Sequence, residues 1–265
     1  MLKQRILTAL LIGLPLIAVL LLAPPVFTIC LFVLVIMQGA WEWSALVQLK
    51  TAWQRGLYVL LVCVSLVLAW LYLRDPEYLP VTMQVALVWW LLALVWIMFF
   101  PQRKSRMLTA IAGLLTLVPA WICITSLLQL NPQWLLFMLL VVVSTDIGGF
   151  LFGRRFGHTK LAVRVSPGKT WEGVMGGLLL SMSVAALGAF WFAQPMSAFL
   201  VVCLLTVMMS IVGDLSESLF KRHAGLKDSG NILPGHGGVL DRVDSITAAA
   251  PVFLYGLSYL GVFVT

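Results

Sequence analysis

The chain contains 265 residues, of which 62% are hydrophobic and only 10% are charged. A soluble domain of this size has too little interior to hide that much apolar surface, so the composition excludes a soluble globular protein. The formal net charge of +7 rests on few charged residues, and their positions therefore bear directly on function.

Nine apolar segments are long enough to cross a bilayer, since a hydrocarbon core of about 30 Å requires about 20 helical residues. Lys3 and Arg5 precede the first segment as they would precede a signal peptide. However, that apolar run is too long for a signal core, and Pro24-Pro25 leads directly into the next segment. We therefore expect an all-α polytopic membrane protein with about nine transmembrane helices. The expected spans are residues 6–23, 26–46, 56–73, 81–100, 107–129, 134–153, 173–193, 196–213 and 246–263.

The lysines and arginines predict the orientation, because these residues are retained on the cytoplasmic side of a membrane. With the N-terminus in the cytoplasm, every Lys and Arg except Arg74 lies on the cytoplasmic face, and the C-terminus lies on the external, periplasmic side. The result is a one-sided basic surface at the inner headgroup layer. Such a surface attracts anionic membrane lipids and phosphate-bearing solutes, and we expect no nucleic-acid partner.

Polar chemistry is confined to the second half of the chain. Residues 1–130 contain about five spans with few functional groups, and we expect them to form an N-terminal transmembrane region. Residues 131–265 contain the remaining spans and two polar cytoplasmic loops, 154–172 and 214–245. We therefore expect residues 131–265 to form the catalytic region.

Asp146 lies inside the sixth predicted span. A carboxylate at membrane depth is unfavourable unless it faces a wet cavity or a partner, so it marks a functional site by default. The alternative is an acid near the helix end that pairs with Arg154 or Arg155. These two arginines are explained equally well as positive-inside anchors.

The loop after this span contains the sequence Ser166-Pro167-Gly168-Lys169-Thr170. A glycine before a lysine lets the backbone approach a phosphate, the two hydroxyls can donate, and the start of the following helix offers free N–H groups to an anion. The segment lacks the GxxxxGK[ST] spacing of a nucleotide-binding P-loop. The segment therefore predicts a phosphate-binding site that is not a P-loop.

A third group of polar residues surrounds the last loop. Asp214, Glu217, Ser218 and Lys221 are spaced so that a helix continuing from the eighth span places all four on one face. Asp241 and Asp244, three residues apart, open the ninth span. Carboxylates are the ligands of Mg²⁺, which takes one or two from the protein and the rest from water and substrate phosphate. The alternative, a solvated charged loop held by salt bridges, is disfavoured because charge is so scarce elsewhere in the chain.

Cations and glycines complete this loop. Lys and Arg bind phosphates as a point charge and as a planar fork, respectively. His236 can donate to a phosphate or hold the loop in shape, and no second histidine stands at a spacing that would predict zinc. Together the residues predict metal-assisted phosphoryl or nucleotidyl transfer. The cationic candidates are Lys221, Arg222, Lys227 and Arg242, and the flexible Gly237 and Gly238 follow His236.

One spaced pattern in this region resembles the signature of the phosphatidate cytidylyltransferases. It runs from Ser218 to Asp244 and includes Lys221-Arg222, Lys227-Asp228, Leu233-Pro234, His236-Gly237-Gly238 and Asp241-Arg242. The resemblance extends to Asp146, to the segment SPGKTWEG and to Gly213-Asp214. It departs from the family pattern only around Asp146, where Thr145 precedes and Gly148-Gly149-Phe150 follows.

The resemblance implies that the protein converts CTP and phosphatidic acid into CDP-diacylglycerol and pyrophosphate at the cytoplasmic face of a bacterial inner membrane. It further implies that Asp214 and Asp241 bind metal, in a paired site for Mg²⁺ and K⁺, and that the enzyme is a homodimer. Asp146 and Asp244 are further metal candidates. The phosphate and substrate candidates are Ser166, Lys169, Thr170, Ser218, Lys221, Arg222, Lys227, His236, Gly237, Gly238 and Arg242.

Two other functions fit the same residues. A CTP-dependent polyprenol kinase would transfer the terminal phosphate and release CDP. A lipid or ion transporter would use Asp146, Asp214 and Asp241 as an intramembrane cation pathway, although transporters often place matching broken helices in both halves of the chain, which this sequence does not.

Overall fold

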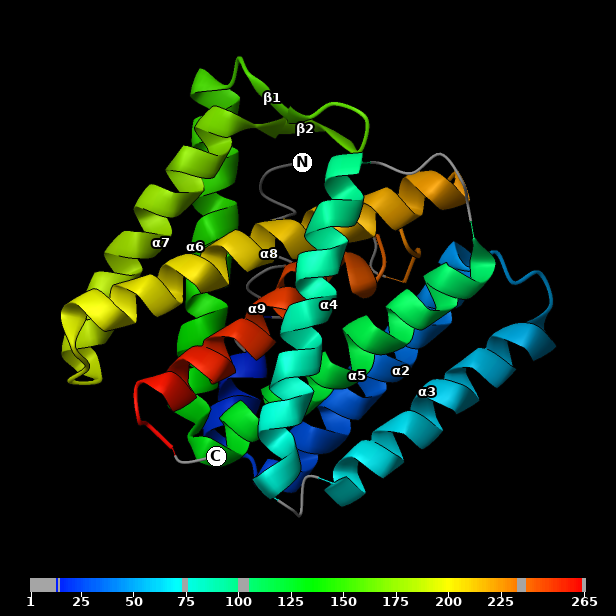
Figure 1. Cartoon of the computed structure of the whole chain (residues 1–265), viewed down its shortest axis with the longest axis horizontal. Helices are drawn as coiled ribbons and strands as arrows, with labels where there is room; N and C mark the ends of the chain where they lie inside the picture. The colour runs from blue at the N-terminus through cyan, green and yellow to red at the C-terminus, as the bar shows by residue number, and fades with distance from the viewer. Residues whose placement is uncertain (1–12, 14, 73–75, 100–104, 233–236, 264–265) are drawn as a thin grey trace.

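The computed structural model describes residues 13, 15–72, 76–99, 105–232 and 237–263. The regular secondary structure of the described part is helical except for one short hairpin, so the expected all-α membrane class is confirmed (Figure 1). The elements are α2 (Pro25–Leu46), α3 (Ala52–Tyr72), the 3₁₀ helix η1 (Pro76–Tyr78), α4 (Leu79–Phe99), α5 (Arg106–Leu130), α6 (Pro132–Phe156), β1 (Lys160–Ala162), β2 (Ser166–Thr170), α7 (Trp171–Trp191), α8 (Met196–Ala224) and α9 (Leu240–Tyr259).

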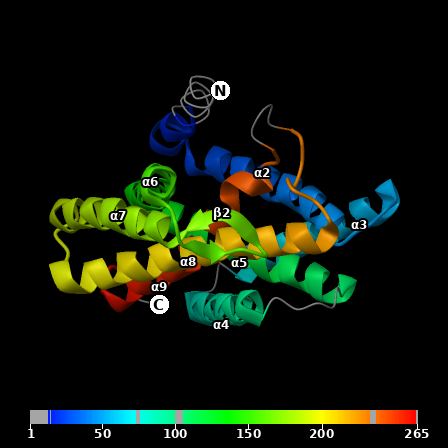
Figure 2. The same ribbon diagram turned by 90° about the horizontal axis from the view of Figure 1, so that it is seen from above.

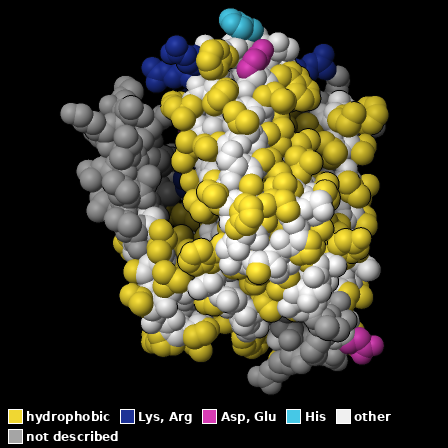
Figure 3. All heavy atoms as spheres, turned by 90° about the vertical axis from the view of Figure 1, so that its left-hand side faces the viewer, with side chains coloured by type: hydrophobic (Ala, Val, Ile, Leu, Met, Phe, Trp, Pro, Cys, Tyr) yellow, Lys and Arg dark blue, Asp and Glu magenta, His cyan; other side chains and the backbone are white. Residues whose placement is uncertain are grey.

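Within the described ranges, the seven helices α2 to α8 are long and apolar enough to cross a membrane. Of the first predicted span, 6–23, residues 6–12 and 14 lie outside those ranges. Helix α9 corresponds to the ninth predicted span but begins with three charged residues, Asp241, Arg242 and Asp244. Figure 3 shows one face of the molecule, where basic side chains lie at one end above a broad apolar surface. The chain is therefore a multi-pass membrane protein.

Local sequence explains where several helices begin and end. Pro25 and Pro132 occupy the first turns of α2 and α6, where a missing N–H costs no hydrogen bond. Helix α8 ends at Ala224, and the next residue, Gly225, has a φ of 76°, a left-handed conformation that is accessible to glycine. The N–H of Leu226 then donates to the carbonyl of Lys221 and closes the end of the helix.

The two polar loops are shorter than expected from the sequence. Helix α6 continues to Phe156, α8 continues to Ala224, and α9 begins at Leu240, so the connections are residues 157–170 and 225–239. The first connection also contains the antiparallel pair β1–β2, which the sequence pattern did not predict. Helix α8 extends beyond its apolar run because its polar residues face other side chains of the site rather than solvent.

The second half of the chain forms two closely packed helix pairs. Figure 2 shows α6 and α7 side by side on one face of α8, with α4 on the opposite face. Glycines allow the α6–α7 contact, because a Cβ at Gly148 would overlap the carbonyl of Gly176. Helix α9 packs along α8 and also contacts α5. These contacts bring the polar ends of α6, α8 and α9 and the hairpin to one region of the molecule.

The helices of the first half pack around this unit. Helix α2 contacts α3, α5, α8 and α9. The ring of Phe220 on α8 lies 5.3 Å from the ring of Trp43 on α2 and 5.5 Å from that of Trp96 on α4. Aromatic contacts therefore join the N-terminal helices to the part of α8 that carries the polar site.

Candidate active site

A cavity of about 390 Å³ opens between α6, α7, α8 and the hairpin. Its wall combines charged side chains with apolar ones, as is common in small-molecule sites, where a few polar groups orient a ligand in a largely apolar cleft. The lining residues are Thr145, Asp146, Gly149, Phe150, Gly153, Arg154, Gly168, Lys169, Thr170, Gly173, Val174, Ile211 and Asp214.

Strand β2 places Lys169 in this cavity, opposite α8. Its ammonium group forms an ion pair with the carboxylate of Asp214, and both side chains are only partly exposed. Thr170, the last residue of β2, accepts a hydrogen bond from the N–H of Gly173 at 3.2 Å and so caps α7. Ser166 begins β2 and pairs with Ala162 of β1. The predicted phosphate segment is thus a short strand that presents its lysine to an acid on a neighbouring helix.

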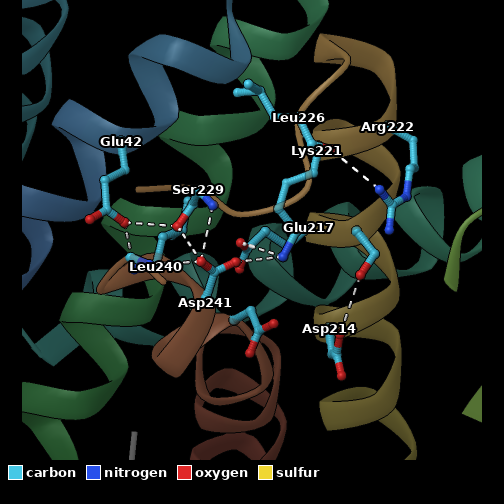
Figure 4. A network of polar contacts seen from close by, with 12 residues as sticks. Glu42, Asp214, Glu217, Lys221, Arg222, Leu226, Ser229, Leu240 and Asp241 are labelled. Carbon is cyan, nitrogen blue, oxygen red and sulfur yellow. Dashed lines mark hydrogen bonds and ion pairs between the residues drawn. The ribbon is translucent and has the colours of Figure 1, made fainter. Parts of the chain in front are cut away.

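A second charged centre lies further along α8, and Lys221 is at its middle. The ammonium group of Lys221 lies 2.6 Å from Asp241 Oδ1 and 3.1 Å from Glu217 Oε1. Glu217 is 3% exposed and Lys221 is 9% exposed. A buried lysine between two acids is held in one position by both of them, so it is a rigid positive charge at the start of α9 (Figure 4).

Asp241 is held by a dense set of hydrogen bonds. Its Oδ2 accepts from the backbone N–H of Gly238 at 2.8 Å and from both the N–H and the hydroxyl of Ser229 at 3.0 Å. Burial alone would raise the pKa of this carboxyl, but the donors, led by Lys221, outweigh it and lower the pKa to about 2. Gly237 has a φ of 82°, and a Cβ there would crowd the same oxygen. The two glycines therefore serve to hold Asp241 in this structure.

The two centres are neighbours on α8. The hydroxyl of Ser218 lies 3.5 Å from Asp214 Oδ1, and electrostatic interactions connect the acids of α6, α8 and α9. Burial, followed by the nearby Asp214 carboxylate, raises the pKa of Asp244. The whole group contains five acids and four cations. The acids are Asp146, Asp214, Glu217, Asp241 and Asp244, and the cations are Arg154, Lys169, Lys221 and Arg242.

This excess of carboxyl groups fits a bound cation, because a nearby cation favours their ionised forms. Among the residues that the structure describes, no three His, Cys, Asp or Glu side chains form a complete cage for a metal ion. Mg²⁺ does not require such a cage, because it binds through one or two carboxylates and keeps its other positions for water and phosphate. Asp214 borders the open cavity and is compatible with this mode. Asp241 does not line that cavity, and a metal bound at its Oδ1 would have to take the place of the Lys221 ammonium group.

Other sequence candidates are placed differently. Arg222 is exposed, and its guanidinium donates to the carbonyl oxygens of Val165 and Leu226, so it ties the end of α8 to the first loop. Lys227 is exposed on the second loop. Asp146 lines the cavity and makes no ion pair with Arg154 or Arg155 in the described part of the chain. His236 lies outside the described residues.

The sequence pattern missed Glu42, which belongs to α2 in the half of the chain expected to carry little chemistry. Its carboxylate is 3% exposed and accepts hydrogen bonds from Ser229 and from the first residues of α9. An acid inside an otherwise apolar span was the available signal, by the same reasoning that identified Asp146.

Comparison with known proteins agrees with the resemblance described above. Residues 3–260 match the cytidylyltransferase family. A phosphatidate cytidylyltransferase of Pseudomonas aeruginosa is 43% identical over 267 residues, with 96% of each chain covered. One from Haemophilus influenzae is 35% identical over 287 residues, covering 96% of this chain and 98% of the relative. One from Brucella suis is 48% identical over 124 residues, 46% of each chain. The match along almost the whole chain confirms that this protein belongs to the cytidylyltransferase family.

Proposed function

We propose that the protein is a phosphatidate cytidylyltransferase, which converts CTP and phosphatidate into CDP-diacylglycerol and pyrophosphate. The observation that carries the proposal is the cavity bordered by Lys169, Asp214 and Asp146 in a multi-pass membrane protein. The printed function of relatives that align along nearly the full length supports the same substrate pair.

In the proposed reaction a phosphate oxygen of phosphatidate attacks the α-phosphorus of CTP. The bond from that phosphorus to the β-phosphate oxygen breaks, and pyrophosphate leaves. The attacking phosphate is already an anion, so a strong general base is not needed. The main obstacle is repulsion between two polyanions, which positioned cations relieve.

We assign this neutralising role to Lys169, Lys221 and Arg242. Lys169 projects into the cavity, and its partner Asp214 keeps its ammonium group there. Lys221 is fixed by Glu217 and Asp241, about two helical turns after the cavity residue Asp214 on α8. Arg222, Lys227, Ser166, Ser218 and His236 remain candidates for contacts with the outer phosphates.

Asp214 and Asp241 are the proposed Mg²⁺ ligands, with Asp146 and Asp244 as the next candidates and K⁺ as a companion ion. The surplus of carboxylates over cations in this region supports the assignment. When bound, the metal would neutralise charge on the phosphate oxygens and on the departing pyrophosphate. The protein's own contribution is to hold the Asp241 carboxylate rigidly through Ser229, Gly238 and Lys221.

The apolar wall of the cavity suits the lipid substrate. Phe150, Val174 and Ile211 lie beside the charged residues and can contact the glycerol and the first part of the acyl chains. This arrangement supports entry of phosphatidate from the membrane and of CTP from the side of the basic loops.

The proposed setting is the bacterial inner membrane, with nine spans, the N-terminus in the cytoplasm and the C-terminus outside. The positive-inside distribution of Lys and Arg supports this orientation. A homodimer is proposed from the family resemblance. Cross-linking in native membranes would test the dimer, and cysteine labelling from each side of the membrane would test the orientation.

The function is tested with purified protein in mixed micelles that contain phosphatidate, Mg²⁺ and CTP. CTP labelled on the α-phosphate should yield a labelled lipid, whereas CTP labelled on the γ-phosphate should yield labelled pyrophosphate and an unlabelled lipid. Asp214→Asn should abolish both products while the protein stays folded in the membrane. Label from the γ-phosphate in the lipid would instead identify a kinase, and no labelled lipid from folded wild-type protein would refute the transferase assignment.

A further inference from the structure

Glu42 is a buried acid of the N-terminal half that reaches the candidate active site. Its Oε1 accepts hydrogen bonds from Gln38 Nε2 and from the N–H of Val239, both at 3.0 Å. Its Oε2 accepts from Ser229 Oγ at 2.9 Å and from the N–H of Leu240 at 2.8 Å. Both oxygens therefore have two donors each, and one of each pair is a backbone N–H at the start of α9.

These contacts supply a helix cap from a distant part of the chain. The first N–H groups of a helix lack intrahelical partners and carry partial positive charge, which a carboxylate stabilises. Val239, at the cap position of α9, provides no side-chain hydrogen bond of its own. Glu42 takes over this function from α2 and thereby fixes the position of the first turn of α9, which contains Asp241.

Ser229 connects the two acids directly. Its hydroxyl lies 2.9 Å from Glu42 Oε2 and 3.0 Å from Asp241 Oδ2, while its backbone N–H donates to the same Asp241 oxygen (Figure 4). A hydroxyl has one proton to donate, so Ser229 lies between two acceptors that compete for it. The side chain of Asp241 is therefore oriented by a chain of contacts that begins at Glu42 and ends at Lys221.

Two glycines make the approach possible. A Cβ at Gly238 would overlap Ser229 Oγ and Glu42 Oε2, and a Cβ at Gly230 would crowd the carboxylate of Glu42. Any larger residue at Gly238 would displace the backbone that donates to Asp241. Glycine at positions 230 and 238 is therefore what allows the carboxylate of Glu42 to lie against this loop.

We propose that Glu42 is a positioning residue for the transfer reaction: through Ser229 and the start of α9, it holds Asp241 in the orientation in which it meets Lys221. The expected effect on turnover rests on the proposed function, whereas the positioning of Asp241 by Glu42 does not. Glu42 does not line the cavity, so it acts through Asp241 and not by contact with a substrate.

The first test compares Glu42→Gln and Ser229→Ala with the wild type in the α-label assay. The glutamine keeps the volume but replaces one acceptor oxygen by an amide NH₂, which must face a backbone N–H whichever way it turns. We expect kcat to fall about 10- to 100-fold, the usual range for residues that orient an active-site ligand. The KM for CTP and for phosphatidate should change far less than kcat. Ser44→Ala, on the same helix, removes a hydroxyl that donates to the carbonyl of Trp41 rather than to Glu42; it is the matched control and should retain nearly wild-type kinetics.

The double variant Glu42→Gln/Ser229→Ala separates the proposal from a general structural role. If both residues act through Asp241, the double variant should be no slower than the slower single variant. Multiplied losses would show independent effects and overturn the proposal, as would wild-type kcat in both single variants. Glu42→Asp should recover part of the activity that Glu42→Gln loses.

Hydrogen exchange gives a reading that does not depend on catalysis. In Glu42→Gln, amides of residues 225–245 should exchange faster, while those of α6 and α7 should be unchanged. The wild-type protein could make no CDP-diacylglycerol while exchange still increases in Glu42→Gln. That result would refute the proposed function but support the positioning of Asp241 by Glu42. Unchanged exchange in this segment would overturn the positioning role even in an active enzyme. If Glu42→Gln does not fold, Ser229→Ala and Glu42→Asp provide the same comparison.

Discussion

Lys221 offers the sharpest test of the charged centre on α8. Lys221→Met retains the length and the apolar stem of the side chain but removes its charge. Glu217, which is 3% exposed, then loses its ion pair at 3.1 Å, and Asp241 loses its contact at 2.6 Å. Both stability and turnover should fall, for separable reasons.

The stability loss follows from the burial of Glu217. Removing one partner of a buried ion pair costs about 3–5 kcal/mol, because the remaining charge is left uncompensated. Asp241 keeps its hydrogen bonds from Gly238 and Ser229, so most of the loss comes from Glu217. We therefore expect a value near the lower end, about 3 kcal/mol, which exceeds a hundredfold change in the folding equilibrium.

A second substitution separates the two effects. Glu217→Gln in the Lys221→Met background removes the uncompensated charge and should restore most of the lost stability. It should not restore turnover, because the positive charge assigned to the phosphates is still absent. Unfolding of the purified protein in detergent, followed by tryptophan fluorescence, measures stability, and the α-label assay measures turnover.

Lys160→Met is the control, since Lys160 is an exposed lysine on β1. It should change stability by less than about 0.5 kcal/mol, as exposed substitutions usually do. If Lys221→Met is as stable as the wild type, the interpretation of Lys221 as a buried counterion is wrong. If the double variant regains turnover, Lys221 serves stability alone.

The other predictions concern packing, the loop and the metal. Gly148→Ala should destabilise the protein by about 1–3 kcal/mol through overlap with the carbonyl of Gly176, seen as a lower unfolding midpoint. Gly238→Ala should reduce turnover strongly and speed hydrogen exchange in residues 225–245, because the new methyl group overlaps Ser229 Oγ; normal turnover would contradict the assigned geometry. Removal of divalent cations by a chelator should abolish turnover, and added Mg²⁺ should restore it; turnover that persists in the chelator would exclude the metal role of Asp214 and Asp241.

Local sequence was sufficient to locate the helices and most of the charged site. The second to ninth predicted spans each correspond to one helix, because continuous apolar runs and flanking prolines act over short distances. The spacing of Asp214, Glu217 and Lys221 correctly indicated one helix face, since helical periodicity relates residues three and four apart. The signature around Asp241 identified the family without any knowledge of the fold.

Contacts between distant segments could not be obtained in this way. Glu42 meets Ser229 and Leu240 across 187 and 198 residues, and no local pattern in α2 specifies its partners. The position of the hairpin that presents Lys169 likewise depends on its packing against α7 and α8. The need for glycine beside Glu42 depends on how α2 packs near the start of α9. The apolar runs and helical spacings of the sequence predict elements because they reflect short-range interactions, whereas the orientation of each acid and lysine in the site results from packing among helices that are far apart in the chain.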